Sequence, residues 1–351
     1  MKLKTLFTAV AALAVLAGLG LLAKSKLGGP AAGGRVGQPL MDGVDLNAAA
    51  RIEIAGPANR VTLIAKPTGW AVLEQGEFPA DQGKLNTFLL KLAEQKVADK
   101  VTENPANFGE LGVLTVEENG NKAENRKTGT QFRILDGSGK PLYQLLIGRE
   151  RGANSAAFPG QYVRFPQEKA ALLTGTELTA ETEAKDWIEK PILPAEAEKN
   201  FRLIRVERAG SKPLAFSREQ ADSAWQLDGA TQRGLNVKEI DNLSKKLRDL
   251  EVARIAPAGS ADSTLGRAKL SVVEARTFDG RTFRFDVGES KGAEDFRYAT
   301  VRESLDGSVS DAALKKEAEA FNAKFKNRTF AIPDWDATRL LRERKEYLQG
   351  K

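Results

Sequence analysis

The sequence contains no cysteine and no histidine among its 351 residues. Without cysteine there can be no disulfide bond, thiolate nucleophile, iron-sulfur cluster or lipid-modified N-terminal cysteine. Without histidine, a Ser-His-Asp triad and ordinary zinc sites are excluded as well, because no side chain titrates near neutral pH by default. Carboxylate-only mechanisms and Ser-Lys dyads survive both tests. The lack of cysteine fits an oxidising compartment as well as a reducing one, so it does not locate the protein.

Aromatic residues are also scarce, at 7% of the chain, with four tryptophans. This scarcity makes a glycan-binding groove, which is lined by exposed aromatic side chains, a less attractive expectation. The apolar fraction of 41% and the charged fraction of 28% are those of a folded protein. At about 150 residues per domain, the length predicts about two domains, each large enough to bury its own core.

Basic charge is missing from the middle of the chain, although the net charge is +6. Residues 1–44 sum to +4 and residues 339–351 sum to +3, so residues 45–338 sum to −1. A surface that binds nucleic acid needs lysine and arginine clustered on a folded face. We therefore expect no nucleic-acid partner.

Residues 1–23 contain a long uncharged segment that predicts a transmembrane anchor. Thr5 to Ala23 consist mostly of leucine, alanine and valine. As a helix, this segment would be about 28 Å long, close to the roughly 30 Å hydrocarbon core of a bilayer. We expect a single-pass membrane protein.

The alternative for the same segment is a cleaved signal peptide, for which Gly18 and Gly20 would provide the small-x-small site. Two lysines precede the apolar segment and two follow it, so the charges leave the orientation open. The usual outcome for such an anchor places the body of the protein outside the cytoplasm. Residues 24–44 are rich in glycine and proline and predict a flexible linker.

Beyond the linker the chain resembles itself at a spacing near 155 residues. The matches occur in the same order in both halves: Trp70 with Trp225, Val97 with Val252, Leu111-Gly112 with Leu265-Gly266, Asp136-Gly137 with Asp279-Gly280, Gly148 with Gly288, Tyr162-Val163-Arg164 with Thr300-Val301-Arg302, and Trp187 with Phe325. We therefore predict two tandem repeats, residues 45–199 and 200–351.

Each repeat is predicted to have an α+β fold with an antiparallel sheet. Apolar residues at helical spacing predict a helix near residues 85–92 and another near 237–250. Alternating segments predict strands at residues 51–55, 61–65, 132–135, 142–147, 203–207, 271–275 and 282–287. The Asp-Gly pairs predict hairpin turns, which join antiparallel strands. We interpret Trp70 and Trp225 as core residues rather than ligand-stacking ones.

Several short motifs do not indicate catalysis. Residues 137–140, Gly-Ser-Gly-Lys, lie between two predicted strands and lack the helix that a phosphate-binding loop requires, so they predict a turn. Two carboxylate clusters are better explained by solvated helix faces and caps than by a glycosidase pair; they comprise Glu181, Glu183, Asp186 and Glu189, and Asp334 and Asp336. Residues 336–348 predict a C-terminal helix that packs on the second repeat. We expect no catalytic, cofactor-binding or metal-binding residue.

With the repeats in view, the chain resembles the bacterial family catalogued as domain of unknown function 4340. The resemblance rests on the block from Trp70 to Val97, which includes Ala80-Asp81, and on four short motifs: Asn107-Phe-Gly-Glu-Leu-Gly112, Leu146-Ile-Gly148, Tyr162-Val-Arg164 and Asp186-Trp187. It implies an envelope protein anchored in the bacterial inner membrane with a periplasmic body, often associated with ABC export systems of the gliding-motility auxiliary type. It carries over no catalytic residue. In the second repeat, Thr300 replaces an aromatic residue and Phe325 replaces tryptophan.

Two functions remain open from the sequence. The first is a non-enzymatic accessory or scaffold subunit that presents a sheet surface to a transporter or another envelope protein. Two similar domains suit this role because they can raise avidity or bind a pseudo-symmetric partner. The second is a periplasmic glycan-binding or glycan-cleaving module. Exposure of Trp70 and Trp225 in a common cleft would favour the second.

Overall fold

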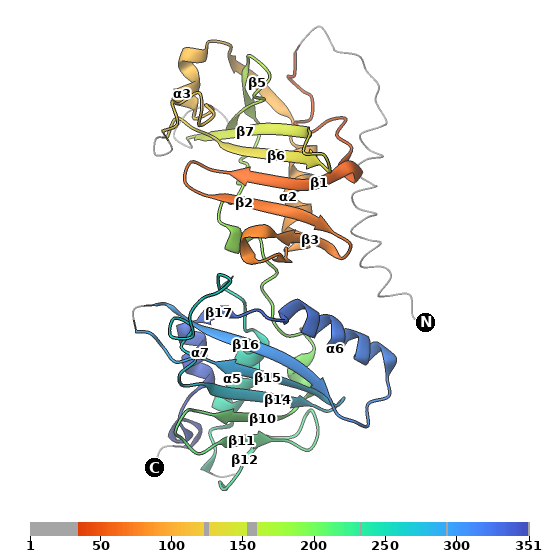
Figure 1. Cartoon of the computed structure of the whole chain (residues 1–351), viewed down its shortest axis with the longest axis vertical. Helices are drawn as coiled ribbons and strands as arrows, with labels where there is room; N and C mark the ends of the chain where they lie inside the picture. The colour runs from red at the N-terminus through yellow and green to blue at the C-terminus, as the bar shows by residue number, and fades with distance from the viewer. Residues whose placement is uncertain (1–33, 123–125, 153–159, 232–233, 293, 350–351) are drawn as a thin grey trace. The chain divides into compact units, whose positions relative to one another are not determined.

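The computed structural model describes residues 34–122, 126–152, 160–231, 234–292 and 294–349 (Figure 1). The predicted anchor, residues 1–23, and the first part of the predicted linker lie outside these residues. Within the described part of the chain, no helix has the length and apolar character needed to cross a membrane.

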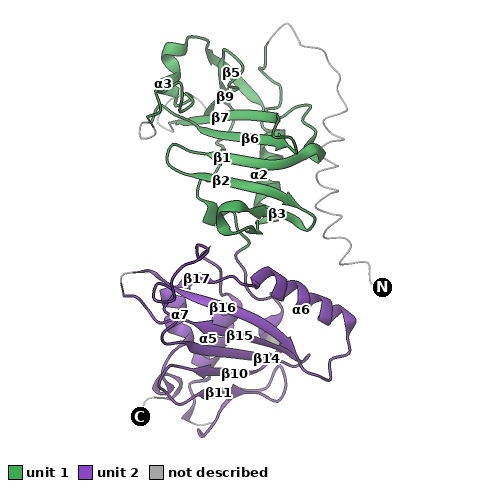
Figure 2. Cartoon of the chain, viewed as in Figure 1, with its two compact units in different colours: residues 1–189 green, residues 190–351 purple. Residues whose placement is uncertain are grey.

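The chain divides into two compact units, the first ending at Glu189 and the second beginning at Lys190 (Figure 2). The second unit begins before its first strand because its leading residues join its core. The backbone N–H of Val252 donates to the carbonyl of Lys190 at 2.8 Å, and that of Ile192 donates to the carbonyl of Leu250 at 3.2 Å.

The first unit is a nine-stranded antiparallel sheet in the order β4-β3-β2-β1-β6-β7-β8-β9-β5. Its strands are β1 (Ala49–Ala55), β2 (Arg60–Lys66), β3 (Gly69–Val72), β4 (Phe78–Pro79), β5 (Val97–Thr102), β6 (Thr130–Asp136), β7 (Pro141–Arg151), β8 (Gly160–Arg164) and β9 (Ala171–Thr174). Its helices are α2 (Gln82–Glu94) and α3 (Phe108–Leu111). Helix α2 covers one face, where the rings of Phe88 and Phe132 meet edge-on at 5.2 Å.

The second unit is an eight-stranded antiparallel sheet in the order β12-β11-β10-β14-β15-β16-β17-β13. Its strands are β10 (Phe201–Glu207), β11 (Leu214–Ser217), β12 (Gln226–Leu227), β13 (Arg254–Ile255), β14 (Ser271–Thr277), β15 (Arg281–Val287), β16 (Phe296–Leu305) and β17 (Phe330–Pro333). Its helices are α4 (Ala197–Asn200), α5 (Val237–Arg248), α6 (Ala312–Phe325) and α7 (Asp334–Leu340), followed by the 3-10 turn η6 (Arg344–Tyr347).

The two sheets have the same strand order once β4 is set aside, with β1 corresponding to β10, β6 to β14 and β5 to β13. The helix between the third and fourth corresponding strands is α2 in one unit and α5 in the other. The predicted strands and both predicted helices are present, and both sheets are antiparallel. The described part of the chain is therefore two α+β units of one topology.

Strand pairing corrects one of the matches between the repeats. The residue before Gly148 faces Val163 in the next strand, whereas the residue before Gly288 faces Ala299. Val163 therefore corresponds to Ala299, and the match drawn from the shared Val-Arg letters is wrong by two residues.

The same pairing restores the aromatic residue in the second unit. Tyr162 corresponds to Tyr298 rather than to Thr300, and Tyr298 is buried. The expected departure from the pattern at this position is therefore wrong.

The match between Trp187 and Phe325 is wrong for a topological reason. Trp187 follows β9, whereas Phe325 ends α6 and precedes β17, the strand that corresponds to β9. Helix α6 is an addition to the second unit, placed where the first unit has only the short connection from β8 to β9.

Two segments near the ends of the described chain differ from expectation. Residues 35–41 pack on the first unit instead of forming part of a flexible linker: Leu40 is 1% exposed, and its carbonyl accepts a hydrogen bond from the Tyr143 hydroxyl at 3.3 Å. At the other end, the helix predicted over residues 336–348 is broken into α7 and η6, because Glu343 and Glu346 form a reciprocal cap that starts a new turn. Leu340 and Tyr347 are buried, as the predicted packing on the second unit requires.

Candidate functional site

The tryptophan motifs of the first unit belong to its core. Asp81 caps α2, accepting from the backbone N–H of Lys84 at 2.8 Å, and its own N–H donates to the carbonyl of Trp187 at 2.7 Å. The Trp187 ring is 1% exposed and meets Phe88 edge-on at 5.9 Å. Trp70 is 9% exposed. These residues connect the strand, the helix and the end of the unit, which is a structural role.

The Leu-Gly and Ile-Gly motifs form a close backbone crossing in both units. A Cβ atom at Gly148 would lie 2.6 Å from the carbonyl oxygen of Leu111, and one at Gly288 would lie 2.5 Å from that of Leu265. The glycines that follow the two leucines have positive φ angles of 69° and 66°. Glycine suits both the positive φ of this turn and the close approach of the two backbones, which explains why the same motif occurs in both units.

The arginine of the Tyr-Val-Arg motif holds a loop on the first sheet. Arg164 is 3% exposed, its Nε donates to the carbonyl of Val113 at 2.9 Å, and its guanidinium also pairs with Glu118. The guanidinium carbon lies 4.8 Å from the ring centroid of Phe108. The positive charge of Arg164 is thus paired with Glu118 within the first unit.

The carboxylates singled out from the sequence are not brought together as a catalytic pair. Asp336 pairs with Lys246 at 2.6 Å, whereas Asp334 pairs with Arg297 at 2.6 Å. In the other cluster, Glu181, Glu183 and Asp186 precede Trp187, whose indole N–H donates to the Glu181 carbonyl at 2.8 Å, and Glu189 follows it. Over the described residues, no group of three or more potential ligands could hold a metal ion.

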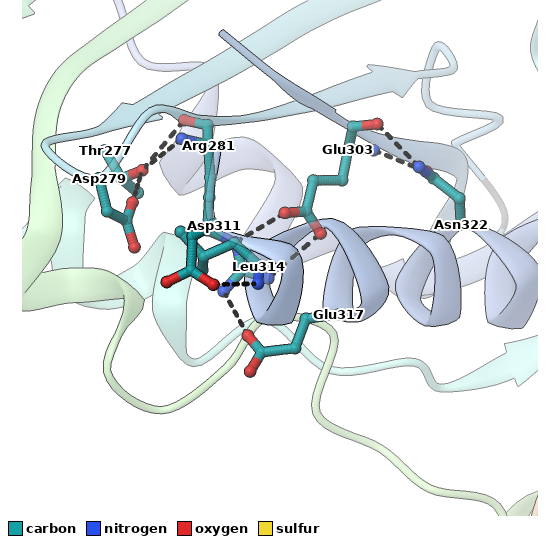
Figure 3. Close-up of polar contacts among 8 residues, drawn as sticks. All are labelled: Thr277, Asp279, Arg281, Glu303, Asp311, Leu314, Glu317 and Asn322. Carbon is teal, nitrogen blue, oxygen red and sulfur yellow. Dashed lines mark hydrogen bonds and ion pairs between the residues drawn. The ribbon is translucent and has the colours of Figure 1, made fainter. Parts of the chain in front are cut away.

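The most buried ion pair in the described part of the second unit lies under α6 (Figure 3). The Glu303 side chain is fully buried and accepts from Arg281 Nε at 2.6 Å. The backbone of Glu303 and the side chain of Asn322, on α6, exchange two hydrogen bonds of 2.9 and 2.8 Å. Glu317, also on α6, lies 3.4 Å from Arg281 and is half exposed.

This network stabilises the attachment of α6. Burial alone would lower the pKa of Arg281, but the hydrogen bond and charge of Glu303, with smaller contributions from Glu317 and Asp279, raise the pKa overall. Arg281 therefore stays charged, and its positive charge is matched by a carboxylate in the core. The network has the character of a structural clamp rather than of a reaction centre.

A different environment surrounds Trp335, on α7. Trp335 is 55% exposed, whereas Trp70, Trp187 and Trp225 are each 9% exposed or less. The ring lies under two cations, with Lys246 Nζ 4.3 Å and Arg339 Cζ 5.3 Å from its centroid.

Beside this ring, α5 and α7 border a groove of about 310 Å³. The groove is lined by Glu239, Asn242, Leu243, Lys245, Lys246, Asp249, Arg339 and Arg342. We call Trp335 and these residues the α5–α7 groove. A partly exposed tryptophan next to a polar concave surface is the arrangement expected of a binding site.

Sequence reasoning did not identify Trp335 as a site residue. The helix predicted from the sequence begins one residue later, at Asp336, so Trp335 lies outside the predicted helical pattern. The available signal was the position of Trp335 between two aspartates at a helix start, with Arg339 four residues later on the same face. That pattern indicates an outward-facing tryptophan.

Comparison with known proteins gives a family match. No curated protein and no solved structure matches the chain. The family described as domain of unknown function (DUF4340) matches residues 70–271, which is more than half of the chain. The match starts at Trp70 and includes α2, the glycine crossing of the first unit and Arg164. The chain therefore belongs to the DUF4340 family.

Proposed function

We propose that this chain is a non-enzymatic accessory or scaffold protein of the bacterial cell envelope. In this proposal residues 1–23 anchor it in the inner membrane, the body lies in the periplasm, and the partner is a component of an ABC-type export system. The observation that carries the binding role is the exposed Trp335 beside the α5–α7 groove, in a chain whose other tryptophans are buried.

The roles of the family motifs support the same proposal. The tryptophans, the crossing glycines and Arg164 are used for packing, capping and loop attachment. In the second unit, Glu303, Asp334 and Asp336 are each paired with arginine or lysine. These residues thus maintain the fold, and in this proposal the groove on the second unit is the surface for a partner.

The competing proposal is a periplasmic glycan-binding or glycan-cleaving module. It would gain support from Trp70 and Trp225 exposed in one cleft, but both side chains are buried in the cores of different units. Trp335 is the exposed tryptophan that such a module would use. A titration with soluble cell-wall oligosaccharides distinguishes the proposals, since stacking on Trp335 would change its fluorescence.

Copurification tests the accessory role directly. The full chain, tagged at its C-terminus and expressed at its native level, is extracted in mild detergent and separated by size, with the mass measured by light scattering. The proposal predicts elution with a transporter permease or ATPase in a fixed ratio. Elution of the chain alone, with a monomer's mass and no membrane partner, would contradict it.

A further inference from the structure

Some of the basic side chains around the α5–α7 groove have an ion-pair partner and others do not. Arg342 pairs with Glu239, and Lys246 pairs with the buried Asp336. Lys245 and Arg339 also line the groove and are exposed, and neither has an ion-pair partner within the described residues. Two cations are therefore available to a ligand.

Trp335 contacts the basic side chains of the groove. Lys246 reaches from α5 to within 4.3 Å of the ring centroid while it pairs with Asp336, so the ring and the lysine are joined to a buried carboxylate. Arg339 lies one helical turn from Trp335 and also approaches the ring. An apolar surface that is already oriented costs a partner less ordering on binding.

Acidic residues in the same groove limit the class of ligand. Glu239 and Asp249 line it together with the cations. Each of these carboxylates is paired, Glu239 with Arg342 and Asp249 with Arg248. A uniformly anionic surface, such as a membrane, would bring further negative charge against both pairs, which reduces its attraction to the two unpaired cations. A peptide avoids this conflict because it can place separate carboxylates on the cations and an apolar side chain on the ring.

We propose that the α5–α7 groove binds an acidic peptide segment of a partner protein, with an apolar side chain packed on Trp335 and carboxylates paired with Lys245 and Arg339. This inference rests on the proposed accessory function and specifies its binding surface. Aromatic and arginine side chains dominate the binding energy of many protein interfaces. The groove and the exposed ring beside it form the surface on which such a segment would lie.

The test uses the full chain in a neutral detergent and a fluorescently labelled synthetic peptide of twelve residues in which leucine alternates with glutamate or aspartate. Binding is followed by fluorescence anisotropy. The inference predicts saturable binding that weakens as the salt concentration rises, because the ion pairs are exposed. A peptide with lysine in place of each acidic residue should bind at least tenfold more weakly.

Matched variants localise the interaction. Trp335→Ala and Arg339→Glu should each weaken binding of the acidic peptide at least tenfold. Phe278→Ala removes an aromatic side chain that is 39% exposed in the β14–β15 turn, and Arg302→Glu reverses an exposed charge on β16. These two controls should leave the affinity within about twofold. Circular dichroism checks that all four variants are folded.

Three outcomes would overturn the inference. The first is equal binding of the acidic and basic peptides, and the second is unchanged binding after Trp335→Ala. The third is loss of acrylamide quenching of Trp335 in mixed micelles containing phosphatidylglycerol, without any peptide binding, which would assign the groove to anionic lipid. Copurification keeps the two proposals distinguishable. A partner that copurifies without any peptide binding would support the accessory function and contradict the peptide-binding groove. Peptide binding without a copurifying partner would support the groove and contradict the accessory function.

Discussion

Replacing Gly148 by alanine should destabilise the first unit, and replacing Gly288 should do the same to the second. An added Cβ would approach the carbonyl oxygen of Leu111 to 2.6 Å or that of Leu265 to 2.5 Å. These carbonyl oxygens are backbone atoms, and at Gly148 the added Cβ would also lie 2.5 Å from Val113 Cγ1, so the turn and the strand that cross must move apart. Overpacking of this kind costs about 1–3 kcal/mol, and we expect the upper end here. For a domain of 150–250 residues, about 3 kcal/mol lowers the unfolding midpoint by roughly 6–12 °C.

Hydrogen exchange with mass spectrometry assigns the loss to one unit. Gly148→Ala should speed exchange in β6 to β8, and Gly288→Ala should speed it in β14 to β16. Gly137→Ala is the matched control, because a Cβ there would meet no atom within 4 Å. If Gly148→Ala proved as stable as this control, the crossing would not be the tight contact described above.

Three further predictions concern charged groups and Trp335. Glu303→Gln leaves the charge of Arg281 buried without its partner and should lower the free energy of unfolding, measured by urea titration, by about 3–5 kcal/mol. The side chain of Glu317 is 52% exposed, so Glu317→Gln should change the same free energy by less than about 0.5 kcal/mol. Burial alone would raise the pKa of Asp334, but the hydrogen bond and charge of Arg297 outweigh it and lower the pKa below the usual 3.8. The Asp334 carboxylate thus stabilises the fold fully above about pH 4 and loses this effect as the pH falls through its folded pKa. Asp334→Asn should therefore flatten the dependence of stability on pH in that acidic range. An unchanged slope would count against the pairing of Asp334 with Arg297. Iodide should quench the fluorescence of Trp335 more strongly than caesium, because Lys246 and Arg339 attract the anion; equal quenching at low salt would contradict a cationic groove.

Local patterns in the sequence were sufficient to predict most of the fold. The helix faces of α2 and α5 are visible as apolar residues three and four apart, and the hairpin turns are visible because they contain glycine, which adopts a positive φ at Gly139 and Gly280. The ungapped spacing from Trp70 to Val97 also holds, since strand pairing places Trp70 and Trp225 at corresponding positions. Features that depend on neighbouring residues can therefore be predicted from the local sequence.

Errors arose where long-range packing decides the structure. The shift between Tyr162 and Tyr298 could be seen only from strand pairing, because a Val-Arg pair occurs by chance near the corresponding position. The C-terminal break after Leu340 occurs among good helix formers, and it lets Tyr347 pack against Phe216, with ring centroids 4.7 Å apart. The shift has no local signal, and the break has only the Glu343–Glu346 cap as one.

The candidate site was the least predictable part. No reactive residue type drew attention to the α5–α7 groove, which brings together α5 and α7 from positions about 90 residues apart. Trp335 gave only a weak local signal, and its exposure became evident when the other three tryptophans proved to be buried.

The claim that this chain acts by binding through its second unit is tested most directly by one quantitative comparison. The full chain, its Trp335→Ala variant and its Phe278→Ala variant are each extracted from native membranes, and the amount of transporter subunit eluting with each is measured. We predict that Trp335→Ala loses the partner and Phe278→Ala retains it. Equal amounts of partner with both variants, or no partner with the wild type, would contradict the claim.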